Sequence, residues 1–115
     1  MRALIVDDDA AVSHILSRCL TQWGWLTDEV PCVSAALVSF ENGSYDLLLC
    51  DVDLPDGDGI SLARTLLKVK SPLVVIIASA DPQNLDQARE AGFPACLNKP
   101  FKMDDLQALI EAIHL

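Results

Sequence analysis

The sequence is poor in basic residues, and this shortage excludes one large class of function. Eight Lys and Arg residues stand against seventeen Asp and Glu residues, which gives a net charge of −9 at pH 7. A surface of that charge repels phosphate backbones, so we expect no direct contact between this domain and nucleic acid. Cations and basic protein surfaces are the partners that the charge favours.

A regular cysteine framework is also missing. The four cysteines, Cys19, Cys32, Cys50 and Cys96, include no CxxC pair. Such spacing favours neither zinc chelation nor a dense set of disulfides. We interpret the four residues as buried, reduced thiols, as expected for a protein of the cytoplasm.

Long hydrophobic runs are absent as well. The longest purely apolar run covers residues 73–78, and three consecutive aspartates follow the first short apolar segment. This pattern predicts neither a membrane span nor a signal peptide. The chain does have hydrophobic residues at 51% of its 115 positions, enough for one core. We therefore expect residues 1–115 to form a single domain.

Short apolar segments alternate with amphipathic ones along the chain. Residues 47–50 are apolar on both faces, as in a parallel strand that helices cover on each side. The predicted strands cover residues 3–6, 26–30, 47–50, 73–78 and 95–98. The predicted helices cover residues 12–23, 34–42, 59–70, 81–91 and 106–113, with Ser34 as the expected cap of the second. This alternation indicates a three-layer α/β domain with a five-stranded parallel sheet between helices.

Carboxylates collect where the predicted strands end. Asp7 and Asp8 follow the first strand, and Asp51 follows the third. Ligands bind beyond the carboxyl ends of the strands in open α/β sheets, so these side chains meet if the two strands are neighbours. Carboxylates that lie so close repel one another, and this repulsion either raises a pKa or recruits a cation. Oxygen ligands with room for water suit Mg²⁺ or Mn²⁺ better than zinc. The sequence therefore predicts a divalent metal site.

Two further polar residues, Ser79 and Lys99, follow the fourth and fifth predicted strands. They add a hydroxyl donor and a positive charge to the predicted metal site. Such a set suits phosphoryl transfer, in which the charge on the phosphoryl oxygens has to be neutralised. Asp51 stands alone at its strand end and is the best candidate for the nucleophile. The adjacent Asp7 and Asp8 are the candidates for a pair of metal ligands.

Four motifs, in this order, resemble the receiver domain of bacterial two-component response regulators over essentially the whole chain. They are LIVDDD at residues 4–9, YDLLLCD at residues 45–51 with Leu54-Pro55 and Asp58-Gly59, Ser79-Ala80, and Lys99-Pro100-Phe101. The resemblance implies a flavodoxin-like fold with strand order 2-1-3-4-5. It implies a phosphoacceptor switch, and no enzyme activity except the promotion of its own phosphorylation and dephosphorylation.

The resemblance also implies roles for single residues in the metal site. Asp51 is then phosphorylated by a histidine kinase or a phosphotransfer protein. Asp7 and Asp8 hold Mg²⁺ together with Asp51 and the backbone carbonyl of Asp53. Among the ligands implied in this way, the carbonyl of Asp53 is the only one that comes from the main chain.

The implied switch uses the other two polar residues and one face of the domain. Lys99 pairs with the phosphoryl group, and Ser79 is the switch hydroxyl. Phosphorylation then changes the surface of the fourth helix, fifth strand and fifth helix, which would bind an output domain or partner or form a homodimer. The identity of the output partner is left open.

The chain departs from the family pattern at several positions. Cys96 stands three positions before Lys99, where the family usually has Tyr or Phe, so the aromatic switch residue is absent. The interval between Ser79 and Lys99 is short for the family, which indicates a clipped fourth helix or preceding loop. Asp53 and Asp81 place negative charge at two variable positions beside the site, where we expect them to alter the lifetime of the phosphorylated state.

The acidic residues also allow other interpretations. Residues 51–53 resemble the nucleophile motif of the haloacid dehalogenase superfamily, so a Mg²⁺-dependent phosphatase or phosphotransferase is the alternative function. That motif normally ends the first strand, and this chain has no length to spare for a cap domain. Asp9, Asp56 and Asp58 are interpreted as turn formers. The two histidines receive no functional role.

Overall fold

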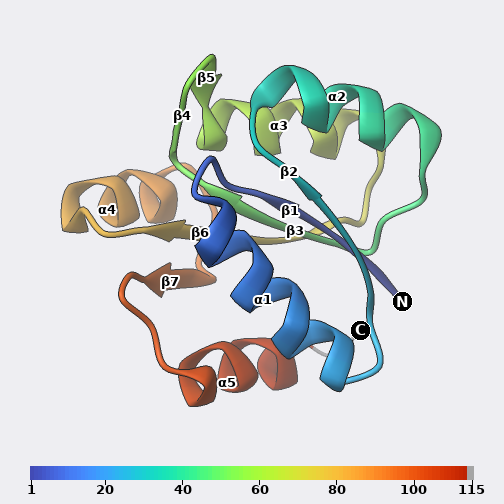
Figure 1. The fold of residues 1–115 in the computed structure, drawn as a ribbon. Coiled ribbons are helices and arrows are strands. Elements are labelled where there is room, and N and C mark those ends of the chain that lie inside the picture. Colours follow the sequence, from blue (N-terminus) through green and yellow to red (C-terminus); the bar gives the residue numbers. More distant parts are fainter. Residues whose placement is uncertain (114–115) are drawn as a thin grey trace.

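A parallel sheet forms the centre of the computed structural model, which describes residues 1–113 (Figure 1). Across these residues the sheet runs β2 (Leu26–Val30), β1 (Arg2–Val6), β3 (Leu47–Asp51), β6 (Val74–Ser79) and β7 (Cys96–Asn98). Each neighbouring pair is parallel. Numbered along the chain as first to fifth, this order is 2-1-3-4-5, which confirms the expected flavodoxin-like sheet.

Helices cover both faces of the sheet, as the alternating sequence predicts (Figure 1). One face packs against α1 (Ala10–Gln22) and α5 (Met103–Ile113). The other packs against α2 (Val33–Asn42), α3 (Gly59–Val69) and α4 (Pro82–Glu90). The three-layer α/β architecture is therefore confirmed, and the bounds of most elements lie within two residues of the predicted ones.

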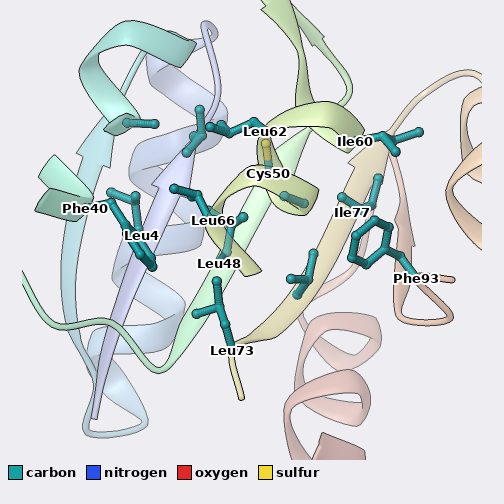
Figure 2. Close-up of a cluster of buried hydrophobic side chains, with 14 of the residues drawn as sticks. Leu4, Phe40, Leu48, Cys50, Ile60, Leu62, Leu66, Leu73, Ile77 and Phe93 are labelled. Atoms are coloured by element: carbon teal, nitrogen blue, oxygen red, sulfur yellow. The ribbon is translucent and has the colours of Figure 1, made fainter. Parts of the chain in front are cut away.

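The core divides into two layers because successive side chains of a strand point to opposite faces. In β1, Leu4 joins the cluster under α2 and α3, whereas Ile5 joins the cluster under α1 and α5. Figure 2 shows Phe40 and Leu66 gathered over Leu4 and Leu48 in the first of these clusters. Burial on both faces explains why β1, β3 and β6 are apolar at every position except one end of each strand.

The segment between β3 and α3 differs from the prediction of a simple loop. It contains a short antiparallel pair, β4 (Asp53–Leu54) and β5 (Gly57–Asp58). The turn between them carries Asp56, whose carboxylate accepts hydrogen bonds from the N–H groups of Val33 (2.7 Å) and Ser34 (3.0 Å). The prediction that Ser34 caps α2 is thus wrong, because the cap comes from a distant segment of the chain.

The four cysteines are free thiols, but the expectation that all are buried is wrong in part. Cys19 and Cys50 are buried, whereas Cys32 and Cys96 are half-buried. Cys96 lies at the start of β7, a strand of three residues at the edge of the sheet. In the described part of the chain, β7 has a neighbouring strand, β6, on one side only. Over residues 1–113, no helix has both the length and the apolar character that crossing a membrane requires.

Candidate functional site

The polar residues predicted from the sequence come from one edge of the sheet. Asp7 follows β1, Asp51 ends β3, Ser79 ends β6 and Lys99 follows β7. Strand pairing places Asp51 beside Ala78 and Ser79 beside Asn98. Because all the strands are parallel, their carboxyl ends lie at the same edge, where α/β sheets bind their ligands.

Three carboxylates meet at this edge. Asp7, Asp8 and Asp51 each offer an oxygen, and these three atoms all lie within 4.8 Å of one another. Asp7 is buried, Asp51 is half-buried and Asp8 is exposed, so the cluster is open to water on one side. An oxygen-only donor set with access for water fits Mg²⁺, which keeps several waters when proteins bind it.

The backbone around the acids fixes their orientation. The N–H of Asp9 donates to Oδ1 of Asp7 at 2.9 Å, which turns the other oxygen of Asp7 toward Lys99. On the opposite side, Gly59 lies so close to the carbonyl of Asp51 that a Cβ would be 1.9 Å from that oxygen. The sequence therefore provides a glycine where the start of α3 passes the end of β3.

Lys99 supplies the positive charge in the cluster. Its Nζ lies 2.5 Å from Oδ2 of Asp7 and 3.4 Å from Oδ2 of Asp51. Burial raises the pKa of the Asp51 carboxyl and the charge of Asp7 adds to the rise, although Lys99 opposes both. Burial disfavours the charged form of Lys99, but the two carboxylates outweigh it and raise the pKa of the ammonium group.

Ser79 is buried and has two hydrogen bonds that the sequence did not predict. The N–H of Asp81 donates to Ser79 Oγ at 3.0 Å, and the side-chain amide of Asn84 donates to the same oxygen at 3.1 Å. The Asn84 amide nitrogen also donates to Oδ2 of Asp53 at 3.0 Å. Asn84 therefore joins two sides of the site, and sequence analysis missed it.

An open hollow of about 490 Å³ lies beside the cluster, lined in part by Asp51, Asp53, Ser79 and Lys99. The carboxylate of Asp53 is outside the group of three converging acids. This placement is compatible with a role for its backbone carbonyl, the contact expected from the resemblance. The hollow has room beside Asp51 for a group of phosphoryl size.

The three aspartates that the sequence predicts to be turn formers act as helix caps, two of them locally and Asp56 across the chain. Asp9 caps α1, Asp58 caps α3 and Asp56 caps α2. Asp81, expected beside the site, lines the hollow but also caps α4 by accepting from the N–H of Gln83. These carboxylates hold helix N-termini, where unpaired N–H groups need acceptors.

Two other sequence predictions concern residues away from the acids. The Sγ atom of Cys96, at the position of the missing aromatic residue, lies 3.4 Å from the carbonyl of Phe93 and 3.9 Å from that of Leu85. The imidazole of His14 lies 3.7 Å from the Glu29 carboxylate and is exposed. His114 falls outside the described residues.

Comparison with known proteins relates the fold and the site to one family. The family model for the response regulator receiver domain matches residues 3–111. The transcriptional regulatory protein KdpE of Staphylococcus aureus is 31% identical over 114 residues, which cover 98% of this chain and 49% of that protein. The chain spans about half the length of several such curated relatives.

Solved structures show the same likeness. The crystal structure of a CheY-like receiver domain protein from Methanospirillum hungatei has a TM-score of 0.86 at 29% identity, covering 97% of this chain and 91% of that one. The response regulator TrrA from Thermotoga maritima, crystallised in complex with Mg(2+)-BeF, also has a TM-score of 0.86, at 26% identity and 97% coverage of each chain.

Proposed function

This chain belongs to the response regulator receiver domain family of two-component systems, and on that basis we propose that it is a switch whose phosphoacceptor is Asp51. The observation that carries the proposal is the cluster of Asp7, Asp8 and Asp51 with Lys99 at the carboxyl edge of the sheet. The residues of this one domain, 1–115, would act as a single unit.

The proposed chemistry is the transfer of a phosphoryl group from a phosphohistidine to the carboxylate of Asp51. A bond forms between a carboxylate oxygen and phosphorus, the bond from phosphorus to the imidazole nitrogen breaks, and the donor histidine leaves as imidazole. Asp51 attacks as a carboxylate, so no base has to remove a proton from it. Lys99, held within 3.4 Å of Asp51, would pair with the phosphoryl oxygens.

The cofactor of the reaction is proposed to be Mg²⁺, or Mn²⁺ in its place. The side chains of Asp7, Asp8 and Asp51 and the backbone carbonyl of Asp53 would hold it. The donor set supports this, and the related TrrA structure is described as a complex with Mg(2+)-BeF. When bound, the ion supplies positive charge that offsets the charge of the carboxylates and of the phosphoryl oxygens.

The proposed partners are a histidine kinase or phosphotransfer protein as donor, and an unidentified output domain or protein as receiver of the signal. Several curated relatives are transcriptional regulators of about twice this length. The net charge of −9 supports basic protein partners and no direct contact with nucleic acid by this domain. The surface of α4, β7 and α5 would bind the output partner or form a homodimer contact. The proposed location is the cytoplasm, with which the four free thiols are compatible.

Intact-mass measurement after incubation with acetyl phosphate or phosphoramidate tests this function. We expect a single phosphoryl adduct that requires Mg²⁺, is stable in acid and labile in base, and disappears in Asp51→Asn. The matched control is Asp86→Asn, which changes an exposed aspartate of α4 that pairs with Arg89 and should leave the adduct intact.

Two results would count against the switch. Failure of every donor to label the protein would favour an interaction domain that works without phosphate. Rapid hydrolysis of the donor without an isolable adduct would favour the alternative of a Mg²⁺-dependent phosphatase with Asp51 as nucleophile.

A further inference from the structure

Asn84 connects Ser79 to Asp53 across the hollow beside Asp51. It lies in the first turn of α4, which begins at Pro82, immediately after the short segment that follows β6. This early start places the half-buried amide over the end of the strand. From there its nitrogen donates to Ser79 Oγ at 3.1 Å and to Asp53 Oδ2 at 3.0 Å.

The orientation of the Asn84 amide follows from its partners. A carboxylate has only acceptor atoms at neutral pH, so the group that faces Asp53 has to be the amide nitrogen. That nitrogen carries two hydrogens, one for Asp53 and one for Ser79. The Ser79 oxygen is therefore an acceptor in this contact.

Ser79 accepts a second hydrogen bond from the backbone N–H of Asp81 at 3.0 Å. A serine oxygen has two lone pairs and carries one proton. With both lone pairs engaged, the hydroxyl proton is the only hydrogen-bonding capacity that Ser79 has left. Among residues 1–113 the structure records no acceptor for it, and Ser79 lines the same hollow as Asp51 and Lys99.

We propose that Asn84 is a positioning residue for phosphorylation: by occupying an acceptor site on Ser79, it leaves the Ser79 proton to be donated to a phosphoryl oxygen on Asp51. This inference rests on the proposed function of Asp51. Without the Asn84 donor, the hydroxyl of Ser79 is free to rotate and spends less time as a donor to the incoming group. Adduct formation becomes slower, although every group in the acid cluster remains.

The rate of adduct formation with acetyl phosphate and Mg²⁺, followed by intact mass, tests the role of Asn84. We expect Asn84→Ala to slow the reaction about three- to tenfold, the range of one lost hydrogen bond. Asn84→Asp should slow it more, because a carboxylate accepts the Ser79 proton and draws it away from the phosphoryl group. The control is Gln83→Ala, which removes an exposed amide from the same turn of α4 and should leave the rate unchanged.

A double variant separates positioning from a purely structural role. If Asn84 acts through the hydroxyl, then Asn84→Ala should change the rate less than about twofold when Ser79→Ala is already present. Asn84→Asp has nearly the shape of the natural residue and a charge that suits a helix N-terminus, but the new carboxylate faces that of Asp53, so preservation of the fold needs a direct check. Thermal unfolding of each variant checks this.

The outcomes distinguish this inference from the function on which it rests. A wild-type protein that no donor labels overturns both. Normal labelling of the wild type with an equal rate for Asn84→Ala overturns the role of Asn84 alone. The role of Asn84 is also overturned if Asn84→Ala slows the reaction equally when Ser79→Ala is present. It is overturned as well if adding Asp53→Asn to Asn84→Ala restores the rate, because the effect of Asn84 then runs through Asp53.

Discussion

Gly59 lies against the backbone of Asp51, the proposed phosphoacceptor. A Cβ at Gly59 would lie 1.9 Å from the Asp51 carbonyl oxygen and 2.9 Å from the Cys50 sulfur. The N–H of Gly59 also donates to the carbonyl of Val52 at 2.8 Å. The carbonyls of Asp51 and Val52 are main-chain groups that cannot rotate away, so any side chain at Gly59 has to displace the strand end that presents Asp51.

Replacement of this glycine should therefore affect stability and function together. We expect Gly59→Ala to lower the free energy of unfolding by about 2 to 3 kcal/mol, as overpacking of a core does, and to slow adduct formation at Asp51. Urea unfolding and intact mass measure the two effects. In the control Gly57→Ala, the new Cβ would lie 3.0 Å from a Val33 side-chain methyl, which can shift, so the loss should be smaller. Equal stability of the two variants would contradict this reading.

At the scale of secondary-structure elements, aspartates hold the N-termini of four helices. Asp9, Asp58 and Asp81 cap α1, α3 and α4 from the residue just before each helix. In α2 the residue at that position, Cys32, makes no capping hydrogen bond with its side chain. Asp56, in the turn between β4 and β5, supplies the cap instead and so ties that turn to α2.

The cap on α2 makes part of the stability depend on pH. The N–H groups of Ser34 and Val33 lower the pKa of the Asp56 carboxyl below its ordinary value of about 3.9. A carboxyl whose pKa is lowered in the folded state stabilises the protein when the pH is above the ordinary pKa. This contribution is lost as the pH falls through the lowered pKa. We expect Asp56→Asn to unfold more easily than wild type at neutral pH, and we expect this difference to shrink as the pH falls through the lowered pKa.

Thermal unfolding at a series of pH values measures that difference. The matched control is Asp86→Asn, whose carboxylate pairs only with exposed Arg89 on α4, at 3.3 Å. Exposed pairs of this kind contribute little, so its stability should follow wild type at every pH. If the unfolding temperatures of wild type and Asp56→Asn differed by the same amount at every pH, the charge of Asp56 would not be the source of its stabilising effect.

At the scale of the whole molecule, the acid cluster is a source of repulsion that a bound cation relieves. The chain carries a net charge of −9, and three of its carboxylates have oxygens within 4.8 Å of one another. A ligand that binds only the folded state stabilises it by mass action. A metal bound at the proposed site would thus link its occupancy to the stability of the entire domain.

We expect Mg²⁺ at about one hundred times its dissociation constant to raise the free energy of unfolding by about 2.7 kcal/mol. Asp8→Asn should remove most of this gain, and because Asp8 is exposed the change should leave the fold intact. Thermal unfolding with MgCl₂, compared with NaCl at equal ionic strength, separates binding from general screening. The proposed metal site would be contradicted if both salts raised the free energy of unfolding equally. It would also be contradicted if MgCl₂ stabilised Asp8→Asn as much as wild type.

Much of the fold and part of the site follow from the sequence by itself. Apolar runs and helical spacing are local patterns, and they located the strands and helices now seen in the structure. All strands of a parallel sheet end at one edge, so residues that follow the strands were expected to meet. Asp7, Asp51 and Lys99 do lie together for this reason. The strand order itself came from the resemblance to a family, because periodicity does not specify which strands pair.

Only the tertiary structure decided the contacts between segments that are far apart in the chain. The capping of α2 by Asp56 joins residues more than twenty positions apart, and the Asn84 bridge depends on how α4 is rotated over the end of β6. The half-burial of Cys96 likewise depends on the position of β7 at the edge of the sheet. Such features arise from the packing of whole elements, which is a property of the assembled layers, whereas the strands, the helices and the acids at the strand ends are determined residue by residue.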